Sequence, residues 1–286
     1  MKKINLIAFA IMIVVALAVG CGGSAGGAAM PQAPAGSLLR KIQDRGRLVV
    51  GVKYDVPTFG YMNPQTKQLE GFDVDLAREI AGYIFGDSSK IEFKEAVTAN
   101  RTPFLKDGTV DLVLATFTIT EDRMKDIDFS VVYYVSGDKF LVAQDSVIKG
   151  IQDLGGKKVA VNKGSSSEAL LTKSTQAVLV PVNSTGDALQ LVKNRQADAM
   201  TGDDVALLGT ALMNPGFKVV GAPMNIAPLG VGVPKNSPEL LTAVNTVIKT
   251  LKSSGKWKTI WKTEIGDKFG MSVAPEPPGD DWKIAK

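Results

Sequence analysis

Residues 105–123, with the sequence LKDGTVDLVLATFTITEDR, decide the fold. They predict the end of a helix, a tight turn at Gly108, a short buried strand over residues 111–115 and then a polar loop. Residues 192–204, VKNRQADAMTGDD, repeat the same order of elements. A chain that builds the same unit twice is expected to form two similar lobes.

Strands and helices alternate on both sides of these two units. Apolar runs at residues 47–52 and 157–161 predict buried strands, and apolar spacing over residues 72–85 predicts a helix. Ser237 and Pro238 begin a further helix that should run to about residue 253. This alternation indicates an α/β fold in which each lobe is a mostly parallel sheet flanked by helices. Such folds bind ligands at the carboxyl ends of their strands, and a cleft between lobes favours small molecules.

The amino-terminal residues predict export. Two lysines are followed by an apolar run from Leu6 to Val19 and by Gly20, which is the pattern of a signal peptide over residues 1–20. The run is shorter than the roughly 20 apolar residues that a membrane-spanning helix needs. The sequence LAVGC, ending at Cys21, is similar to the lipobox of bacterial lipoproteins, although Ala18 occupies the position where leucine is the favoured residue. Cys21 is the only cysteine, so we expect it to carry a lipid; the alternative is an inert residue of a discarded leader.

Uncharged and proline-rich segments flank the folded body. Residues 22–37 contain only small, apolar and neutral polar residues, which predicts a lipid-anchored flexible tether over residues 21–37. Residues 272–286 are rich in proline and predict a C-terminal tail. The body should therefore lie between about residues 38 and 271.

The composition excludes several classes of function. The chain has no histidine, which excludes Ser-His-Asp and Cys-His catalysis and histidine-ligated zinc. Neither a phosphate-binding loop nor a dinucleotide fingerprint is present. A net charge of +4 is too small to indicate nucleic-acid binding. We expect no cofactor, no metal and no nucleic-acid partner.

Two arginines occupy unfavourable positions near the amino ends of predicted helices. Thr120 should cap a helix that has Arg123 in its first turn, and Arg101 precedes Pro103 at another helix start. The helix dipole disfavours a cation there unless an anion lies alongside, and arginine binds carboxylates through two parallel hydrogen bonds. The alternatives are that the acidic residues 121–122 neutralise Arg123 and that Arg101 is a surface residue.

Polar residues also follow the predicted strands of the second unit. Asp203 and Asp204 could pair with an ammonium group, or they could be solvated or capping residues. Ser165, Ser166 and Ser167 lie between a strand and a helix, where backbone N–H groups can bind an anion. The alternative for the serines is simple helix capping.

Residues 71–77 (GFDVDLA), 110–123 and 127–134 (IDFSVVYY) carry a family resemblance. Over roughly residues 45–265 the chain resembles the polar amino-acid-binding proteins of bacterial ABC uptake systems, which are family 3 extracellular solute-binding proteins. The resemblance implies the two-lobed type II periplasmic-binding-protein fold. Lobe 1 would comprise residues 38–140 and 228–271 and lobe 2 residues 141–227, with hinge crossings near residues 138–143 and 222–229.

The resemblance also implies contacts to the α-amino acid group. In the family, the arginine at the position of Arg123 binds the ligand's α-carboxylate, and the threonines at positions 116 and 118 add hydrogen bonds. The aspartate at the position of Asp203 takes the ammonium group. In lobe 2, the resemblance implies that Ser165 and Ser166 donate hydrogen bonds to the ligand's carboxylate.

The side-chain contacts suggest an acidic ligand. The segment containing Arg101 resembles the aspartate- and glutamate-binding branch, where this arginine meets the side-chain carboxylate, and Lys53 matches the same branch as a second cation. Two arginines and one aspartate complement two carboxylates and one ammonium, and a buried Arg101 without an anion would be costly.

We therefore expect the extracytoplasmic, lipid-anchored component of an ABC transporter, on the periplasmic side or the outer face of the membrane. It would bind glutamate or aspartate between its lobes, act as a monomer and dock on a membrane permease. The alternatives are binding of glutamine or another polar amino acid, and a cyclohexadienyl dehydratase-like enzyme on the same fold. The sequence assigns no carboxylate to acid–base catalysis, so we do not expect an enzyme.

Overall fold

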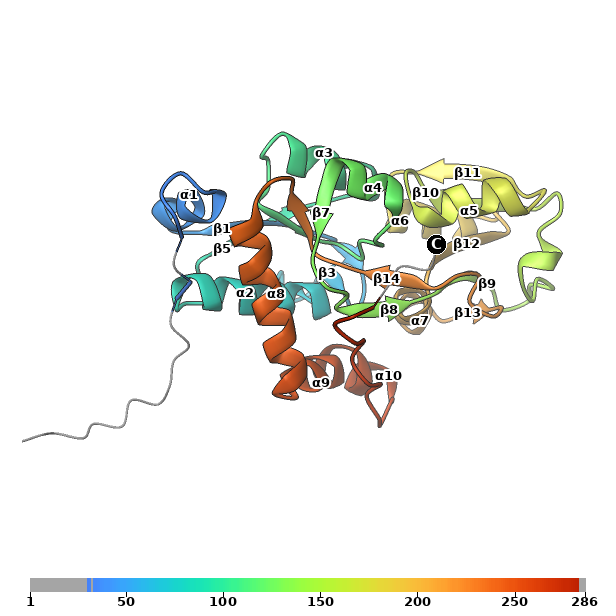
Figure 1. The fold of residues 1–286 in the computed structure, drawn as a ribbon. Coiled ribbons are helices and arrows are strands. Elements are labelled where there is room, and N and C mark those ends of the chain that lie inside the picture. The colour runs from blue at the N-terminus through green and yellow to red at the C-terminus, as the bar shows by residue number, and fades with distance from the viewer. Residues whose placement is uncertain (1–29, 32, 283–286) are drawn as a thin grey trace, which may run out of the picture.

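The computed structural model describes residues 30–31 and 33–282. Figure 1 shows two lobes side by side, joined at the middle of the molecule by the strands β8 (Tyr134–Ser136) and β14 (Ala227–Leu229). The predicted signal peptide, Cys21 and most of the predicted tether lie outside the described residues. The lipid anchor therefore stays a prediction.

Lobe 1 is built on a five-stranded sheet with the order β5-β1-β6-β15-β7. Its strands are β1 (Leu48–Val52), β5 (Ile91–Glu95), β6 (Leu112–Leu114), β7 (Ile127–Phe129) and β15 (Gly232–Pro234). Its helices are α1 (Leu38–Arg45), α2 (Phe72–Phe85), α3 (Arg101–Lys106), α4 (Glu121–Asp126), α8 (Pro238–Ser253), α9 (Lys256–Trp261) and α10 (Asp267–Phe269). A small antiparallel sheet, β2 (Asp55–Val56), β3 (Gly60–Met62) and β4 (Leu69–Glu70), faces lobe 2.

Lobe 2 repeats this arrangement with the strand order β11-β10-β12-β9-β13. Its strands are β9 (Asp138–Ala143), β10 (Lys158–Asn162), β11 (Val178–Val182), β12 (Ala199–Asp203) and β13 (Phe217–Val220). Its helices are α5 (Ser166–Ser174), α6 (Thr185–Lys193) and α7 (Asp204–Met213). The equivalent orders confirm the two similar lobes that the internal repeat predicts.

Each sheet is mixed, and its parallel part is limited to three strands. β5, β1 and β6 run parallel in lobe 1, as do β11, β10 and β12 in lobe 2. β15 and β9 pair antiparallel with both of their neighbours. The reason is that each of these two strands enters its sheet from the other lobe, without the helical crossover that a parallel connection requires.

The two connections between the lobes form a short antiparallel ladder of β8 and β14. The predicted crossing at residues 138–143 lies slightly too far along the chain, because these residues form β9 within the lobe 2 sheet. The crossing predicted at residues 222–229 contains β14. The β9 strand thus begins at the junction of the lobes, which places Asp138 beside the cleft.

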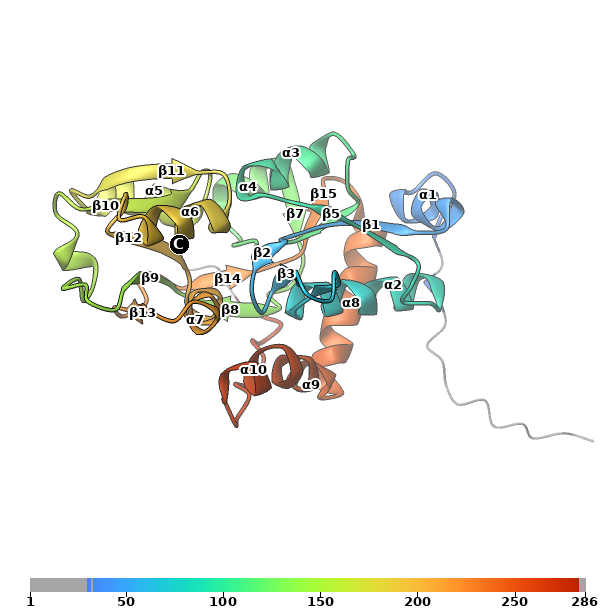
Figure 2. The same ribbon diagram turned by 180° about the vertical axis from the view of Figure 1, so that it is seen from behind.

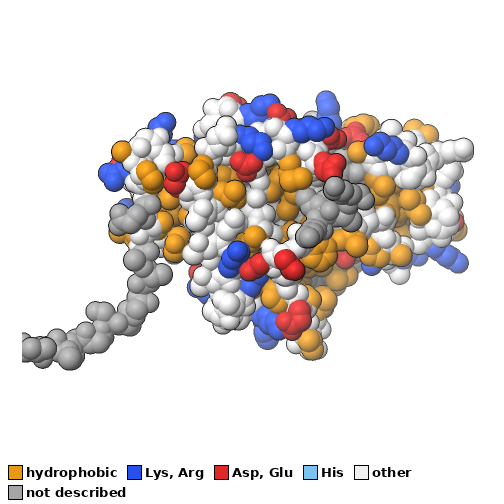
Figure 3. All heavy atoms as spheres, in the orientation of Figure 1, with side chains coloured by type: hydrophobic (Ala, Val, Ile, Leu, Met, Phe, Trp, Pro, Cys, Tyr) orange, Lys and Arg blue, Asp and Glu red, His pale blue; other side chains and the backbone are white. Residues whose placement is uncertain are grey.

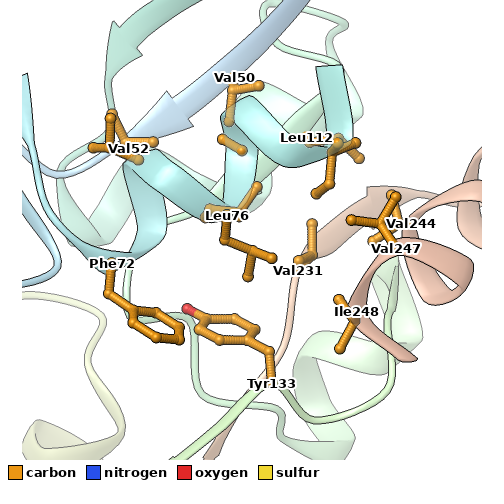
Figure 4. Packing of buried hydrophobic residues seen from close by; sticks show 14 of the residues in the cluster. Val50, Val52, Phe72, Leu76, Leu112, Tyr133, Val231, Val244, Val247 and Ile248 are labelled. Atoms are coloured by element: carbon orange, nitrogen blue, oxygen red, sulfur yellow. The ribbon is translucent and has the colours of Figure 1, made fainter. Parts of the chain in front are cut away.

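The lobe 1 core holds the strand ends in position. α2 forms over the predicted residues because its apolar side chains share one face, and that face packs with α8 against the sheet. Figure 4 shows Leu76 of α2 and Val244 of α8 on either side of Val231, all fully or almost fully buried. Burial of each such side chain stabilises the fold by roughly 1.5–3 kcal/mol.

Candidate functional site

A polar cavity of about 50 Å³ lies between the lobes at the carboxyl ends of β1, β10 and β12. Since one water needs roughly 10–15 Å³ of such space, the cavity suits a small polar molecule. Seven of the eight ligand-binding residues predicted from the sequence line it, and the exception is Arg123. The seven are Lys53, Arg101, Thr116, Thr118, Ser165, Ser166 and Asp203.

Arg101 is buried, with 3% of its surface exposed. Its Nε donates to the Thr98 carbonyl at 3.1 Å, and its Nη1 donates to the carbonyls of Ala115 and Thr116 at 3.0 Å each. The guanidinium carbon also lies 4.4 Å from the centre of the Phe117 ring, within the range of a cation–π contact. Carbonyl dipoles and an aromatic face therefore partly stabilise the charge of Arg101, but burial still lowers the pKa of its guanidinium well below the usual value, so the need for an anion stays a prediction.

Arg123 lies at the edge of the cavity rather than in its wall. Thr120 caps α4 as predicted, accepting a hydrogen bond from the Arg123 amide at 3.3 Å. The guanidinium donates to the Thr118 carbonyl at 2.6 Å and, across the cleft, to the Gly164 carbonyl at 3.0 Å. Asp122 pairs with Lys125 instead of Arg123. The alternative that acidic neighbours neutralise Arg123 is therefore not supported for Asp122.

Lys53 follows directly after β1 and is 2% exposed. Its Nζ donates to Thr98 Oγ1 at 2.8 Å. Burial, and then the charge of Arg101, lower the pKa of Lys53 to about 8. The cavity therefore has two cations side by side, and the described residues offer neither of them a carboxylate within ion-pair distance.

Two aspartates form the opposite part of the wall. Asp203 is the last residue of β12, and Asp138, the first residue of β9, is its partner in the antiparallel ladder. Burial, and then the neighbouring Asp138, raise the pKa of Asp203 to about 7. Asp204 does not line the cavity; it accepts hydrogen bonds from Ser136 Oγ and the Val205 amide instead. Of these two adjacent aspartates, only Asp203 therefore lines the cavity, and its contact with an ammonium group stays a prediction.

Sequence reasoning missed Asp138. Nothing in its local sequence marks it, because its place in the wall depends on the pairing of β9 with β12, two strands about sixty residues apart. The one available signal was its position as the first residue of the crossing predicted at residues 138–143.

The serine turn serves partly as a helix cap. Ser165 Oγ accepts from the Glu168 amide at 3.0 Å, and the Ser165 amide donates to the Asn162 carbonyl at 3.0 Å. The predicted N–H donor of Ser165 is therefore already engaged. Ser166 Oγ lies 3.4 Å from Thr118 Oγ1 across the cleft, so Ser166 is better placed to contact a molecule between the lobes.

Asp73 holds the strained backbone at Thr116. Thr116 has a φ of 45°, in the left-handed region that residues with a side chain seldom adopt. Its amide donates to Asp73 Oδ2 at 2.8 Å, and Tyr133 donates its hydroxyl to the other oxygen at 2.7 Å. Burial raises the pKa of Asp73 to about 6. This contact turns the carbonyl of Thr116 toward Arg101, so a residue of α2 orients the cavity wall.

The lobes also touch through an acidic side chain outside the cavity wall. Asp55 of β2 accepts hydrogen bonds from the amides of Thr185 and Gly186, at 2.6 and 3.1 Å, through one oxygen. These amides lie at the amino end of α6 in lobe 2, where the helix dipole favours an anion (Figure 2). Together with the Arg123–Gly164 contact, this closes the cleft around the cavity.

Two features that would indicate other classes of protein are absent from the described residues. They contain no cluster of three or more Asp, Glu, His or Cys side chains arranged to hold a metal ion. Across residues 30–31 and 33–282, no helix has both the length and the apolar character needed to cross a bilayer.

Comparison with known proteins identifies the family. Residues 48–267 match the family of bacterial extracellular solute-binding proteins, family 3. A glutamine-binding protein of a Bacillus subtilis ABC transporter is 37% identical, over 93% of this chain and 98% of its own length. A glutamate-binding protein of Corynebacterium efficiens is 27% identical, over 91% and 89% of the two chains.

The fold comparison agrees. The crystal structure of a solute receptor for L-cysteine from Neisseria gonorrhoeae superposes with a TM-score of 0.79 at 29% identity, covering 83% of this chain and 97% of the receptor. The two-lobed α/β fold predicted from the sequence is thereby confirmed. The chain belongs to the family 3 bacterial extracellular solute-binding proteins, and it is a binding protein rather than an enzyme.

Proposed function

We propose that the chain captures an amino acid for an ABC importer and that its preferred ligand is L-glutamine, held in the cavity between the lobes. The observation that carries this choice is the environment of Arg101. Three backbone carbonyls already accept hydrogen bonds from its guanidinium, so a neutral amide oxygen is a ligand acceptor of the same kind. The similarity to a glutamine-binding protein over nearly the whole chain supports the same ligand.

In this proposal, different residues of the cavity wall bind the ammonium group and the carboxylate of the amino acid. Asp203 faces the ammonium group, and the hydroxyls of Thr116 and Thr118 offer hydrogen bonds on the lobe 1 side. Arg123 exchanges its carbonyl contact with Gly164 for the ligand's α-carboxylate, which also approaches Ser166 at the amino end of α5. Charge-assisted hydrogen bonds of this kind contribute about 1.5–3 kcal/mol each.

The side-chain amide of glutamine fits the remaining part of the wall. Its carbonyl oxygen is an acceptor for Lys53 and Arg101, and its amide nitrogen is a donor for threonine hydroxyls such as that of Thr98. A neutral amide also tolerates the low pKa of Lys53, since it can bind either protonation state of the amine.

Glutamate is the second candidate, and the pairing of two cations favours it. Lys53 and Arg101 lie in the same part of the wall, and a side-chain carboxylate would neutralise one of them. Glutamate binding would then require protonated Lys53. Its affinity should fall as the pH rises through about 8, whereas the affinity for glutamine should change little.

Isothermal titration calorimetry with each of the twenty amino acids at pH 7.5 tests the proposal. We expect glutamine to bind with one site per chain and at least tenfold more tightly than glutamate. Tighter binding of glutamate would make glutamate the preferred ligand of the same site. If no amino acid binds, the proposed function is wrong.

We further propose that the chain works as a monomer tethered through a lipid on Cys21 and delivers its ligand to a membrane permease. Acidic and basic side chains are interspersed on the face shown in Figure 3, as is usual for a soluble binding domain. Labelling with a radioactive fatty acid tests the anchor. The label should appear on the chain and be lost in Cys21→Ser; equal labelling of this variant would refute it.

A further inference from the structure

The cavity wall contains one carboxylate more than the capture of an amino acid requires. Asp138 is 4% exposed and lines the same cavity as Asp203. The two residues are direct partners across the β9–β12 ladder, so their side chains leave the sheet on the same face, with Cβ atoms roughly 5 Å apart.

The support around Asp138 fixes its carboxylate without requiring its charge. Asn225 donates from Nδ2 to Asp138 Oδ2 at 2.7 Å, and Asn225 Oδ1 accepts from the Asp138 amide at 2.8 Å. An asparagine at position 138 would still accept the Asn225 bond through its single oxygen, so packing alone does not explain why a buried charge stands here.

The electrostatics of the two aspartates favour a cation between them. Burial raises the pKa of Asp138, and hydrogen bonds from Ser167 and Asn225 only partly oppose this. The pKa of Asp203 is raised as well, so near neutral pH the empty pair tends to keep a proton that two isolated aspartates would lose. The other titratable groups acting on the pair are Asp204 on α7, Arg123 on α4, Arg101 on α3, Lys53 after β1 and the phenols of Tyr133 and Tyr134.

We propose that Asp138 is a specificity-determining residue which, together with Asp203, forms a two-carboxylate subsite for the protonated α-amino group of the ligand. The inference rests on the proposed function, in that it takes the ligand to be an amino acid. The ammonium group enters between the carboxylates, and the proton held by the empty pair leaves to solvent. A molecule of the same shape that lacks the amine leaves two buried carboxylates without a cation, and the subsite rejects it.

The test compares L-glutamine with glutaramic acid, which is glutamine without its α-amino group. Binding of both is measured by calorimetry at pH 7.0 in two buffers with different enthalpies of ionisation, which reports the number of protons released. The variants are Asp138→Asn, Asp203→Asn and the matched control Asp145→Asn, whose carboxylate pairs with Arg195 on the exposed surface of lobe 2. Thermal unfolding checks that each variant is folded.

We expect the wild-type chain and Asp145→Asn to prefer glutamine to glutaramic acid and to release a substantial fraction of one proton on binding glutamine. In Asp138→Asn the preference should fall by about tenfold to hundredfold, as the loss of one charge-assisted hydrogen bond implies. Proton release should also fall, because Asp203 then loses the repulsion of the neighbouring carboxylate and only burial still raises its pKa. A purely structural role for Asp138 would leave the ratio of the two affinities unchanged.

Unchanged preference and proton release in Asp138→Asn would overturn the inference and leave Asp203 as the sole partner of the amine. If another amino acid binds in place of glutamine, the same comparison is made with its desamino analogue. If no amino acid binds, the proposed function fails and the inference fails with it. Should Asp138→Asn not fold, the wild-type chain still decides, because the absence of proton release with glutamine between pH 6 and 8 would overturn the inference.

Discussion

Replacing Asp55 by asparagine should weaken the contact that holds the two lobes together. One oxygen of Asp55 accepts hydrogen bonds from the amides of Thr185 and Gly186 at the amino end of α6. Asparagine can keep a neutral hydrogen bond there, but it loses the charge that interacts with the amides and with the helix dipole. Hydrogen bonds to a charged group contribute about 1.5–3 kcal/mol against about 1 kcal/mol for neutral ones, and the dipole adds about 0.3–1 kcal/mol.

The substitution therefore lowers the stability of the closed arrangement of the lobes, relative to the open one, by about 1–2 kcal/mol. This lowers the ratio of closed to open molecules by roughly 5- to 30-fold. If the ligand binds the closed form, the dissociation constant for glutamine should rise by a similar factor. Calorimetry measures that constant, and small-angle X-ray scattering of the ligand-bound chain reports whether saturation still gives the compact form.

Asp187→Asn is the matched control, because Asp187 lies in the first turn of the same helix but is exposed and accepts no hydrogen bond across the cleft in the described structure. It should leave the glutamine affinity within about twofold of wild type. Equal affinities for Asp55→Asn and Asp187→Asn would refute the reasoning, since the cross-lobe contact would then contribute nothing to capture.

Three further predictions concern the cavity and its support. Arg123→Ala should reduce the affinity for every amino acid by at least a hundredfold, measured by calorimetry; an effect confined to one ligand would contradict its assignment to the α-carboxylate. Lys53→Met should weaken glutamate binding more than glutamine binding and remove the fall in glutamate affinity near pH 8, and persistence of that fall in a pH series would assign it to another group. Relative to wild type, Asp73→Asn should gain about 2.4 kcal/mol of stability as the pH rises from 4 to 7.5, because the folded-state pKa of Asp73 is raised to about 6 and its ionisation costs stability as the pH rises from the unfolded pKa near 4 through that value. Urea unfolding at both pH values measures this change, and a pH-independent difference would contradict it.

Local patterns were sufficient to predict much of the fold. The apolar spacing over residues 72–85 gives α2 with the observed bounds, and Ser237 with Pro238 gives the start of α8. The repeat of residues 105–123 at 192–204 gives the two lobes. Each of these features depends on residues close together in the chain, where helix periodicity and turn chemistry act directly.

Features that depend on pairing between distant segments were not predictable. Asp138 reaches the cavity because β9 runs antiparallel to β12, and Asp55 reaches α6 only when the lobes meet. The environment of Arg101 was likewise hidden, because its acceptors are backbone carbonyls, which no side-chain pattern reveals. The proposed ligand changed from an acidic amino acid to glutamine because of this environment together with the similarity to a glutamine-binding protein.

A crystal structure of the chain grown with L-glutamine tests the central claim most directly. We predict one glutamine between the lobes, with its ammonium group against Asp203 and its side-chain amide against Arg101. A cavity that stays free of glutamine at saturating concentration, or a glutamine bound elsewhere on the chain, would contradict the account.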